Sequence, residues 1–329
     1  MSFLTLGIET SCDETAASVL ADERDVRSSI VASQFVHSKY GGVVPELASR
    51  AHIRLIIPVV RSALEVAGTP AEAINLVAAT YAPGLLGALL VGLPFGKAFA
   101  WSRDIPFVGV NHLEGHVFAV LLQHPDFAPP FVVLIVSGGH TELLVVEEPC
   151  RYRMLGATLD DACGEAFDKA AKLLSFPYPG GAFIEQRGRL GRRTIRFPIP
   201  HVAGLDFSFS GLKTSLLYYL RDHGRGDIDD ICHSFQETLI DVLLEKIASA
   251  VRATGIRRVA VTGGVAVNGR LRERLNALGG AEGFEVRFPD KPLCTDNAAA
   301  IAACGRERFR RFGPSSLAIP ALSREAIGT

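Results

Sequence analysis

Two histidines lie four residues apart in the stretch NHLEGH, at positions His112 and His116. On a helix each residue turns by about 100°, so the two side chains share one face at a spacing that suits two imidazole ligands of one metal ion. A zinc protease would place its general-base glutamate directly after the first histidine. That position is Leu113, and Glu114 points to another side of the helix. The stretch therefore favours a metal site, or two core histidines, over a hydrolytic centre.

A third ligand would distinguish a metal site from a pair of core histidines. The candidate is Asp296 in PLCTDNAAAIAACG, where a carboxylate stands in a turn before an alanine-rich helix. The other interpretation is that Asp296 caps this helix, because aspartate is a favoured N-cap residue. Both interpretations stay open at the level of this segment.

Three polar turns follow apolar stretches that predict strands. In FLTLGIETSCDETAASVLA and FVVLIVSGGHTELLVVE the turn leads into a second apolar stretch, which predicts two antiparallel hairpins. In RRVAVTGGVAVNGRLRERL the turn leads into an amphipathic helix. Gly138 and Gly139 permit close backbone approach, so that N–H groups can converge on an anion. A nucleotide site is favoured over plain hairpin turns, and the lack of GxxxxGK[ST] excludes a P-loop.

The repeated hairpin predicts two α/β lobes of related topology. Helical stretches at 54–68, 84–101, 160–175 and 230–254 alternate with the strands, which is typical of layered α/β proteins. We expect an N-terminal lobe of residues 1–128 plus 297–329 and a C-terminal lobe of residues 129–296.

The bulk properties exclude several classes of protein. Of the 329 residues 48% are hydrophobic and the formal net charge is −1, so the chain is a globular protein without a global affinity for nucleic acid. The most apolar run is broken by Pro94 and Lys97, and no membrane segment is predicted. Six scattered cysteines and the lack of a signal-peptide pattern favour reduced thiols in the cytoplasm.

Charged clusters offer further candidates. An acidic helical face at 160–175 precedes the turn YPGG, an arrangement that suits a ribose or amino-acid moiety or else a solvated surface. Two basic runs, RGRLGRRTIR at 187–196 and RERFRRF at 306–312, suit phosphate backbones or else form ordinary solvated surface.

Ten motifs stand in the order seen in one family: GIETSCDETAASV, HSKYGGVVPELASRAH, APGLLGALLVG, NHLEGH, IVSGGHTELL, GEAFDKAAKLL, YPGG, DFSFSGLKT, TGGVAVNGRLR and CTDNAA. With them the sequence closely resembles the TsaD family of tRNA adenosine threonylcarbamoyltransferases, formerly described as glycoproteases, over residues 5–303. The chain departs from the family pattern at Ala82, Ala182, Arg187-Gly188, Ala298 and Ala300, and none of these departures removes a ligand named below.

The resemblance implies the two-lobed actin/Hsp70/sugar-kinase-like (ASKHA) fold with an interlobe nucleotide cleft. It implies an acyltransferase that moves the threonylcarbamoyl group of threonylcarbamoyl-AMP to the exocyclic amine of adenosine 37, in tRNAs that read ANN codons, with release of AMP. The implied partners are a TsaB-like paralogue that dimerises through helices of the N-terminal lobe and a TsaE-like ATPase, whereas a homodimer suffices in the mitochondrial version.

Site residues carry over motif by motif. His112, His116 and Asp296 resemble the ligands of one divalent metal ion, iron or zinc. The residues that resemble the adenylate contacts are Ile135, Val136, Ser137, Gly138, Gly139, Asp168, Gly181, Glu185 and Asn268.

The implied reaction decides what else the site must supply. The donor is a mixed carbamic–phosphoric anhydride that is already activated, so the protein needs no nucleophile of its own. It must position the reactants, stabilise developing charge and remove a proton from the amine. The candidates for the general base are Glu9, Asp13, Glu14 and His140, and the sequence does not choose among them.

Two alternatives share the fold. A small-molecule kinase would carry a catalytic aspartate and no histidine pair, so NHLEGH argues against it. A catalytically silent scaffold homologue should have lost the metal ligands, and here all three are present.

Overall fold

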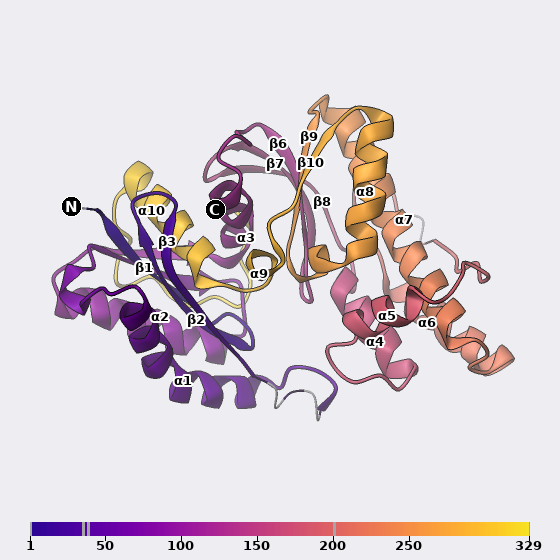
Figure 1. Ribbon diagram of the computed structural model, residues 1–329, viewed down its shortest axis with the longest axis horizontal. Helices are drawn as coiled ribbons and strands as arrows, with labels where there is room; N and C mark the ends of the chain where they lie inside the picture. Colours follow the sequence, from indigo (N-terminus) through magenta and orange to yellow (C-terminus); the bar gives the residue numbers. More distant parts are fainter. Residues whose placement is uncertain (1, 35–36, 38–39, 200–201, 329) are drawn as a thin grey trace. The chain divides into compact units, whose positions relative to one another are not determined.

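The computed structural model describes residues 2–34, 37, 40–199 and 202–328. The chain divides into two compact units, one of Met1–Ala128, Glu148–Arg151 and Thr295–Thr329 and the other of Pro129–Glu147 and Tyr152–Cys294. Each unit is organised around a five-stranded sheet (Figure 1).

The first sheet has the strand order β3–β2–β1–β4–β5. Strands β1 (Leu4–Glu9), β2 (Glu14–Ala21) and β3 (Asp25–Ser33) are antiparallel, whereas β4 (Leu76–Ala82) and β5 (Phe107–Asn111) continue the sheet parallel to β1. The predicted N-terminal hairpin is confirmed, and β3 extends it by a third strand.

Helices cover both faces of the first sheet. Helices α1 (Pro45–Val66) and α2 (Leu86–Ser102) pack on one face, and α10 (Ala298–Phe312) packs on the other (Figure 1). Helix α10 comes so close to β1 that a Cβ on Gly7 would lie 2.1 Å from the carbonyl oxygen of Ala298. The short 3₁₀ helix η2 (Ala71–Ala73) leads into β4.

The second sheet repeats this plan with the order β10–β9–β6–β7–β8. Strands β6 (Phe131–Val136) and β7 (Thr141–Glu148) form the second predicted hairpin, which β8 (Arg151–Ala157) extends. Strands β9 (Arg258–Thr262) and β10 (Glu285–Arg287) add on the other side of β6 in parallel. In both sheets a central strand therefore has an antiparallel pair on one side and a parallel pair on the other.

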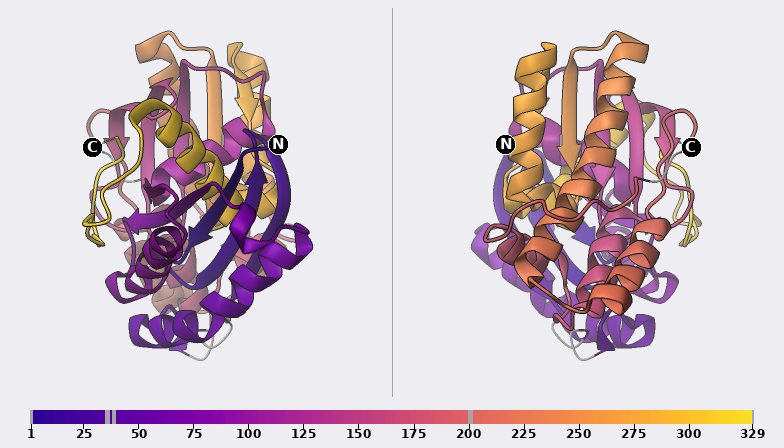
Figure 2. Two further views of the ribbon diagram at one scale, coloured as in Figure 1. Left: turned by 90° about the vertical axis from the view of Figure 1, so that its left-hand side faces the viewer. Right: turned by 90° about the vertical axis from the view of Figure 1, so that its right-hand side faces the viewer.

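The helices of the second unit are α4 (Cys163–Leu173), α5 (Gly181–Gly188), α6 (Ser210–His223), α7 (Ile228–Thr254), η3 (Gly264–Val267), α8 (Gly269–Glu282) and α9 (Lys291–Cys294). Helix α7 begins after Asp227, whose carboxylate accepts from two backbone N–H groups, and ends at Gly255 in the left-handed conformation. Helices α7 and α8 run alongside each other (Figure 2).

The four predicted helical stretches are confirmed, although the boundaries differ. Helix α1 begins nine residues before position 54, because Pro45 fits the first turn of a helix, where its missing N–H costs nothing. Helices α1 and α2 both continue through an internal proline, Pro58 and Pro94. Among the described residues, none of the helices combines the length and the apolar character that a membrane crossing requires.

Candidate functional site

Both histidines of NHLEGH lie on α3 (His112–Gln123), which begins directly after β5. The helix is capped by Asn111, whose side-chain oxygen accepts from the N–H of Leu113 at 2.9 Å. The cap makes His112 the first helical residue and places His116 one turn further along. Their ring centroids are 4.7 Å apart.

Asp296 completes a three-residue cluster in the first unit. Its Oδ1 lies 3.6 Å from His112 Nε2 and 3.5 Å from His116 Nε2, and one ligand atom of each residue lies within 4.8 Å of the others. Two ligand atoms about 2.1 Å from a tetrahedral ion are about 3.4 Å apart, so the spacing fits one ion. The buried Nε2 atom of His116 has no hydrogen-bond partner in the described part of the chain, which also fits a metal ligand.

The cap of α10 is Asn297, not Asp296. The side-chain oxygen of Asn297 accepts from the N–H of Ala300 at 2.9 Å, and its amide donates to the carbonyl of Thr295 at 2.8 Å. The interpretation of Asp296 as the helix cap is therefore wrong, because the next residue occupies that position and the Asp296 carboxylate lies beside the two histidines.

Glu9, at the end of β1, contacts the His112 ring at Nδ1, the nitrogen that does not face Asp296. Its Oε2 lies 3.0 Å from His112 Nδ1 and accepts from the hydroxyl of Thr80 at 2.7 Å, while its Oε1 accepts from the N–H of Ser11 at 2.5 Å. A hydrogen bond at Nδ1 fixes the tautomer in which Nε2 offers its lone pair to a metal. Glu9 is 1% exposed, so this geometry favours a positioning role over the general-base role.

Electrostatics in this cluster follow from burial and from the two carboxylates next to His112. Burial opposes ionisation of Glu9, but the charge of His112 and the hydrogen bonds lower the Glu9 pKa overall. Burial disfavours the imidazolium of His112, yet Asp296 and Glu9 raise its pKa to about 9. A metal ion that binds this site must therefore displace a proton from His112.

Glu14, at the start of β2, has a carboxyl group whose surroundings disfavour ionisation. Its burial, together with the charges of Asp296 and Asp13, raises the pKa of Glu14 to about 10. A cation bound by Asp296 would favour the carboxylate form instead. Two of the four general-base candidates are therefore affected by their surroundings. Glu9 is hydrogen-bonded to His112, and the ionisation of Glu14 would depend on whether a metal ion is bound.

We expect Glu9→Gln to weaken metal binding about 10- to 100-fold, since partners behind a metal-bound histidine contribute that much. Competition with a chromogenic chelator measures the affinity. The matched control is Glu142→Gln, which alters a largely buried carboxylate on β7. An affinity equal to that of the unaltered chain would contradict the positioning role.

Glu114, the glutamate between the two histidines, is engaged elsewhere. It is fully buried, and its Oε2 accepts from Arg308 on α10 at 2.7 Å. Next to it, a Cβ on Gly115 would lie 2.5 Å from the side chain of Ile301 on α10. This side of α3 therefore packs on α10, and Glu114 belongs to that packing instead of to the metal cluster.

The predicted adenylate contacts lie in the second unit. Ile135 and Val136 are the last residues of β6 and are fully buried, whereas Gly138 and Gly139 in the turn to β7 are exposed. Of the residues 135–139, those of the turn that begins at Ser137 are therefore the accessible ones. The backbone N–H of His140 closes the turn by donating to the hydroxyl of Ser137 at 3.1 Å.

The start of α4 approaches this turn closely. The N–H of Gly164 donates to the carbonyl of Ser137 at 3.1 Å, and a Cβ on Gly164 would lie 2.5 Å from the same oxygen. Further along α4, the carboxylate of Asp168 accepts from the N–H of Gly180 at 2.7 Å. Asp168 therefore lies next to Gly181, the first residue of α5.

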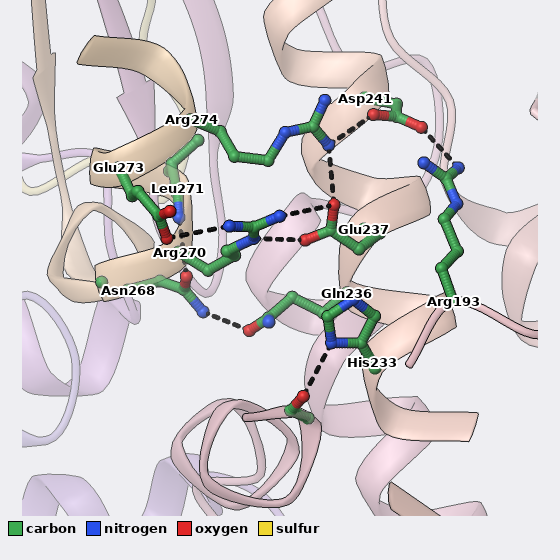
Figure 3. Close-up of polar contacts among 12 residues, drawn as sticks. Arg193, His233, Gln236, Glu237, Asp241, Asn268, Arg270, Leu271, Glu273 and Arg274 are labelled. Atoms are coloured by element: carbon green, nitrogen blue, oxygen red, sulfur yellow. Dashed lines mark hydrogen bonds and ion pairs between the residues drawn. The ribbon is translucent and has the colours of Figure 1, made fainter. Parts of the chain in front are cut away.

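The remaining two predicted contacts meet at the start of α8. Glu185 on α5 accepts from the N–H of Gly269 at 3.0 Å. Asn268 caps α8 through its side-chain oxygen, and its amide donates to Gln236 on α7 at 2.8 Å (Figure 3). Sequence reasoning missed Gln236, just as it missed the contact of Thr80 with Glu9, because neither residue stands in a motif near its partner.

Comparisons with known proteins agree on one family. The family model described as "TsaD: tRNA N6-adenosine threonylcarbamoyltransferase" matches residues 25–303. A tRNA N6-adenosine threonylcarbamoyltransferase of Salinibacter ruber is 53% identical over 93% of this chain and 94% of its own length. One of Syntrophus aciditrophicus is 48% identical over 98% of this chain and 97% of its own length.

Solved structures with low sequence identity share the fold. HypF of T. kodakarensis has a TM-score of 0.67 at 14% identity, over 94% of this chain and 48% of its own. Component A of the Acidaminococcus fermentans (R)-2-hydroxyglutaryl-CoA dehydratase has a TM-score of 0.56 at 16% identity, over 94% of this chain and 99% of its own. The chain therefore has the expected actin/Hsp70/sugar-kinase-like fold.

Proposed function

The chain belongs to the TsaD family of tRNA N6-adenosine threonylcarbamoyltransferases, and from its geometry we propose how it performs this transfer. The donor is threonylcarbamoyl-AMP. The acceptor is the exocyclic amine of adenosine 37 in tRNAs that read ANN codons, and AMP leaves. The observation that supports this proposal best is the cluster of His112, His116 and Asp296, whose spacing fits one ion.

In this proposal His112, His116 and Asp296 hold one divalent ion, iron(II) or zinc(II), because two imidazoles and a carboxylate suit either metal. When bound, the ion supplies Lewis-acid stabilisation of negative charge on the donor. Glu9 keeps Nε2 of His112 available as a ligand atom by accepting a hydrogen bond at Nδ1.

The adenylate is bound by the second unit. The exposed backbone of Gly138 and Gly139 offers N–H groups to the phosphate, and the half-buried Ser137 begins their turn. Asp168 and Asn268 are held by hydrogen bonds to Gly180 and Gln236, so both side chains are ordered before the donor arrives. Ile135 and Val136, at the end of β6, hold the turn in place from within the sheet. Gly181 and Glu185 on α5 are the remaining adenylate contacts in this proposal.

Proton removal from the acceptor amine falls to one of three groups. Asp13, Glu14 and His140 remain candidates, because Glu9 is enclosed by His112, Thr80 and Ser11. Glu14 can act as a base only when the metal is bound, since its pKa of about 10 keeps it protonated otherwise.

One reaction tests the function. The protein is incubated with threonine, bicarbonate, ATP, an enzyme that makes the adenylate, and unmodified tRNA. Nucleosides from the digested tRNA should then contain threonylcarbamoyladenosine, and a chelator should abolish its formation. ATP-dependent phosphorylation of a small molecule by the chain alone would favour the kinase alternative instead.

We also propose that a TsaB-like paralogue binds an apolar face formed by α1 and α2. A TsaE-like ATPase joins this complex. The complex acts on its tRNA in the cytoplasm. The two helices touch where a Cβ on Gly87 would lie 2.4 Å from the hydroxyl of Ser49. Near this contact four large apolar side chains are about half exposed or more: Ile53, Ile57, Leu86 and Leu90. Such a face is typical of a protein–protein interface.

We expect Leu90→Glu to weaken binding of the TsaB-like protein at least 10-fold, because a buried leucine contributes about 1.5–3 kcal/mol. Titration calorimetry measures the affinity, and Met154→Glu, at an exposed residue of the second sheet, is the control. If the chain instead forms a homodimer that Leu90→Glu dissociates, a second copy occupies this face.

A further inference from the structure

The basic run at 187–196 is mostly neutralised by the protein itself. Three of its five arginines pair with carboxylates of the same unit, each at a nitrogen–oxygen distance of 2.5 Å: Arg187 with Asp229, Arg189 with Glu185 and Arg193 with Asp241. Figure 3 shows Arg193 turned toward α7, where Asp241 also binds Arg274. These three side chains therefore form ion pairs within the second unit, a difference among the five arginines that the sequence alone does not reveal.

The arginines of the second basic run, at 306–312, all contact other groups of the first unit. The guanidinium of Arg306 lies 4.0 Å from the ring centre of Phe3. The other three arginines form ion pairs inside the first unit: Arg308 with Glu114, and Arg310 and Arg311 with Glu307. The hypothesis that this run is a phosphate-binding surface is therefore not supported, because its guanidinium groups already bind other side chains of the first unit.

Arg192 and Arg196 differ from all of these arginines. Both are exposed, and within residues 40–199 and 202–328 no carboxylate lies in ion-pair distance of either. Two uncompensated guanidinium groups four residues apart are a local positive patch on a chain of net charge −1. Such a patch attracts a polyanion even though the whole protein does not.

The segment that carries the two arginines follows a fixed path along α7. The N–H of Arg192 donates to Asp230 at 2.7 Å and that of Ile195 donates to Ser234 at 3.1 Å. The buried ring of Phe197 packs edge-on against Phe235, with ring centres 5.8 Å apart. The backbone is therefore ordered in advance, and a ligand of Arg192 and Arg196 loses little affinity to loop ordering.

An open pocket of about 250 Å³ lies at the same place, lined by Arg193, Thr194, Ile195 and Arg196. One water molecule takes about 30 Å³, so a phosphodiester group with several waters fits. The hydroxyl of Thr194 donates to Asp230 at 3.0 Å, and Arg193 pairs with Asp241. Arg196 is therefore the lining residue whose guanidinium can bind an anion in the pocket. Arginine binds phosphate with two parallel N–H groups, which suits this position.

We propose that Arg192 and Arg196 bind backbone phosphates of the tRNA substrate. The inference rests on the proposed function, since the tRNA is the acceptor there. Contacts to phosphates position a nucleic acid and carry no sequence information. The two arginines therefore set the affinity for tRNA and leave the chemical step to the site residues described above.

The test compares two double variants of the full chain, assayed with its partner proteins. Arg192→Gln with Arg196→Gln should raise the KM for unmodified tRNA about 10-fold at physiological salt, with kcat unchanged. Loss of two phosphate contacts should also lower the slope of log affinity against log salt by about 1.5. The control, Arg221→Gln with Arg252→Gln, removes the same charge from exposed arginines that pair with Asp222 and Glu282.

The outcomes separate the inference from the function on which it rests. An unchanged KM and salt slope, or an equal change in the control, would overturn the inference while tRNA modification by the unaltered chain still stands. Weaker binding of a partner protein at an unchanged KM would overturn it too. Failure of the unaltered chain to modify tRNA would instead refute the proposed function.

Discussion

Replacement of Asp296 by alanine is expected to remove the metal ion and the transferase activity together. In the proposed metal site Asp296 is the one oxygen ligand, and its Oδ1 lies 3.5–3.6 Å from both imidazole nitrogens. Without this carboxylate only two neutral ligands remain, on one turn of one helix, which is too few for a stable divalent site. We expect metal content to fall from about one ion per chain to less than a tenth, and activity to fall at least 100-fold.

Metal analysis after dialysis against a weak chelator measures the first quantity, and formation of the modified nucleoside measures the second. The control is the neighbouring substitution Asn297→Ala. It removes the cap of α10 and should lower stability by about 1 kcal/mol while the metal stays bound. A full metal content in Asp296→Ala would show that the ligand assignment is wrong.

Replacement of Arg308 by methionine is expected to destabilise the first unit by about 3–5 kcal/mol, because it leaves the fully buried carboxylate of Glu114 without its cation. Urea unfolding measures this loss. The control is Arg310→Met, which removes an exposed partner of Glu307 and should change stability little.

The double variant Glu114→Leu with Arg308→Met should recover most of that stability, since two apolar side chains can replace a buried ion pair. It should also keep its metal ion, because Glu114 takes no part in the cluster. Metal loss in the double variant, or full stability in Arg308→Met, would contradict this account.

The sequence was sufficient for the framework and for bringing His112, His116 and Asp296 together as one candidate cluster. Alternating apolar stretches predicted both hairpins, and helical spacing placed His112 and His116 on one face, because these patterns depend on local geometry. Local patterns left open whether Asp296 is a metal ligand or the cap of α10, and the structure shows that the adjacent Asn297 is the cap. Two residues of similar capping propensity cannot be ranked without knowing that Asp296 faces the histidines.

Contacts between distant residues were beyond local reasoning. Glu9 was one of four candidates for the general base, yet its partners His112 and Thr80 lie 103 and 71 residues away. The same holds for the basic runs, because the carboxylate that pairs with Arg193 stands 48 positions further along the chain. Which charges remain available for a ligand is decided by tertiary structure.

More than one kind of contact holds helices α3 and α10 together. The ion pair of Glu114 with Arg308 and the close contact of Gly115 with Ile301 join them without any metal. The proposed ion would add a second link near the start of each helix, because His112 is the first residue of α3 and Asp296 directly precedes the cap of α10. If the proposed ion binds, the chain would fold before it is loaded, and loss of the ion would lower activity while these metal-independent contacts remain.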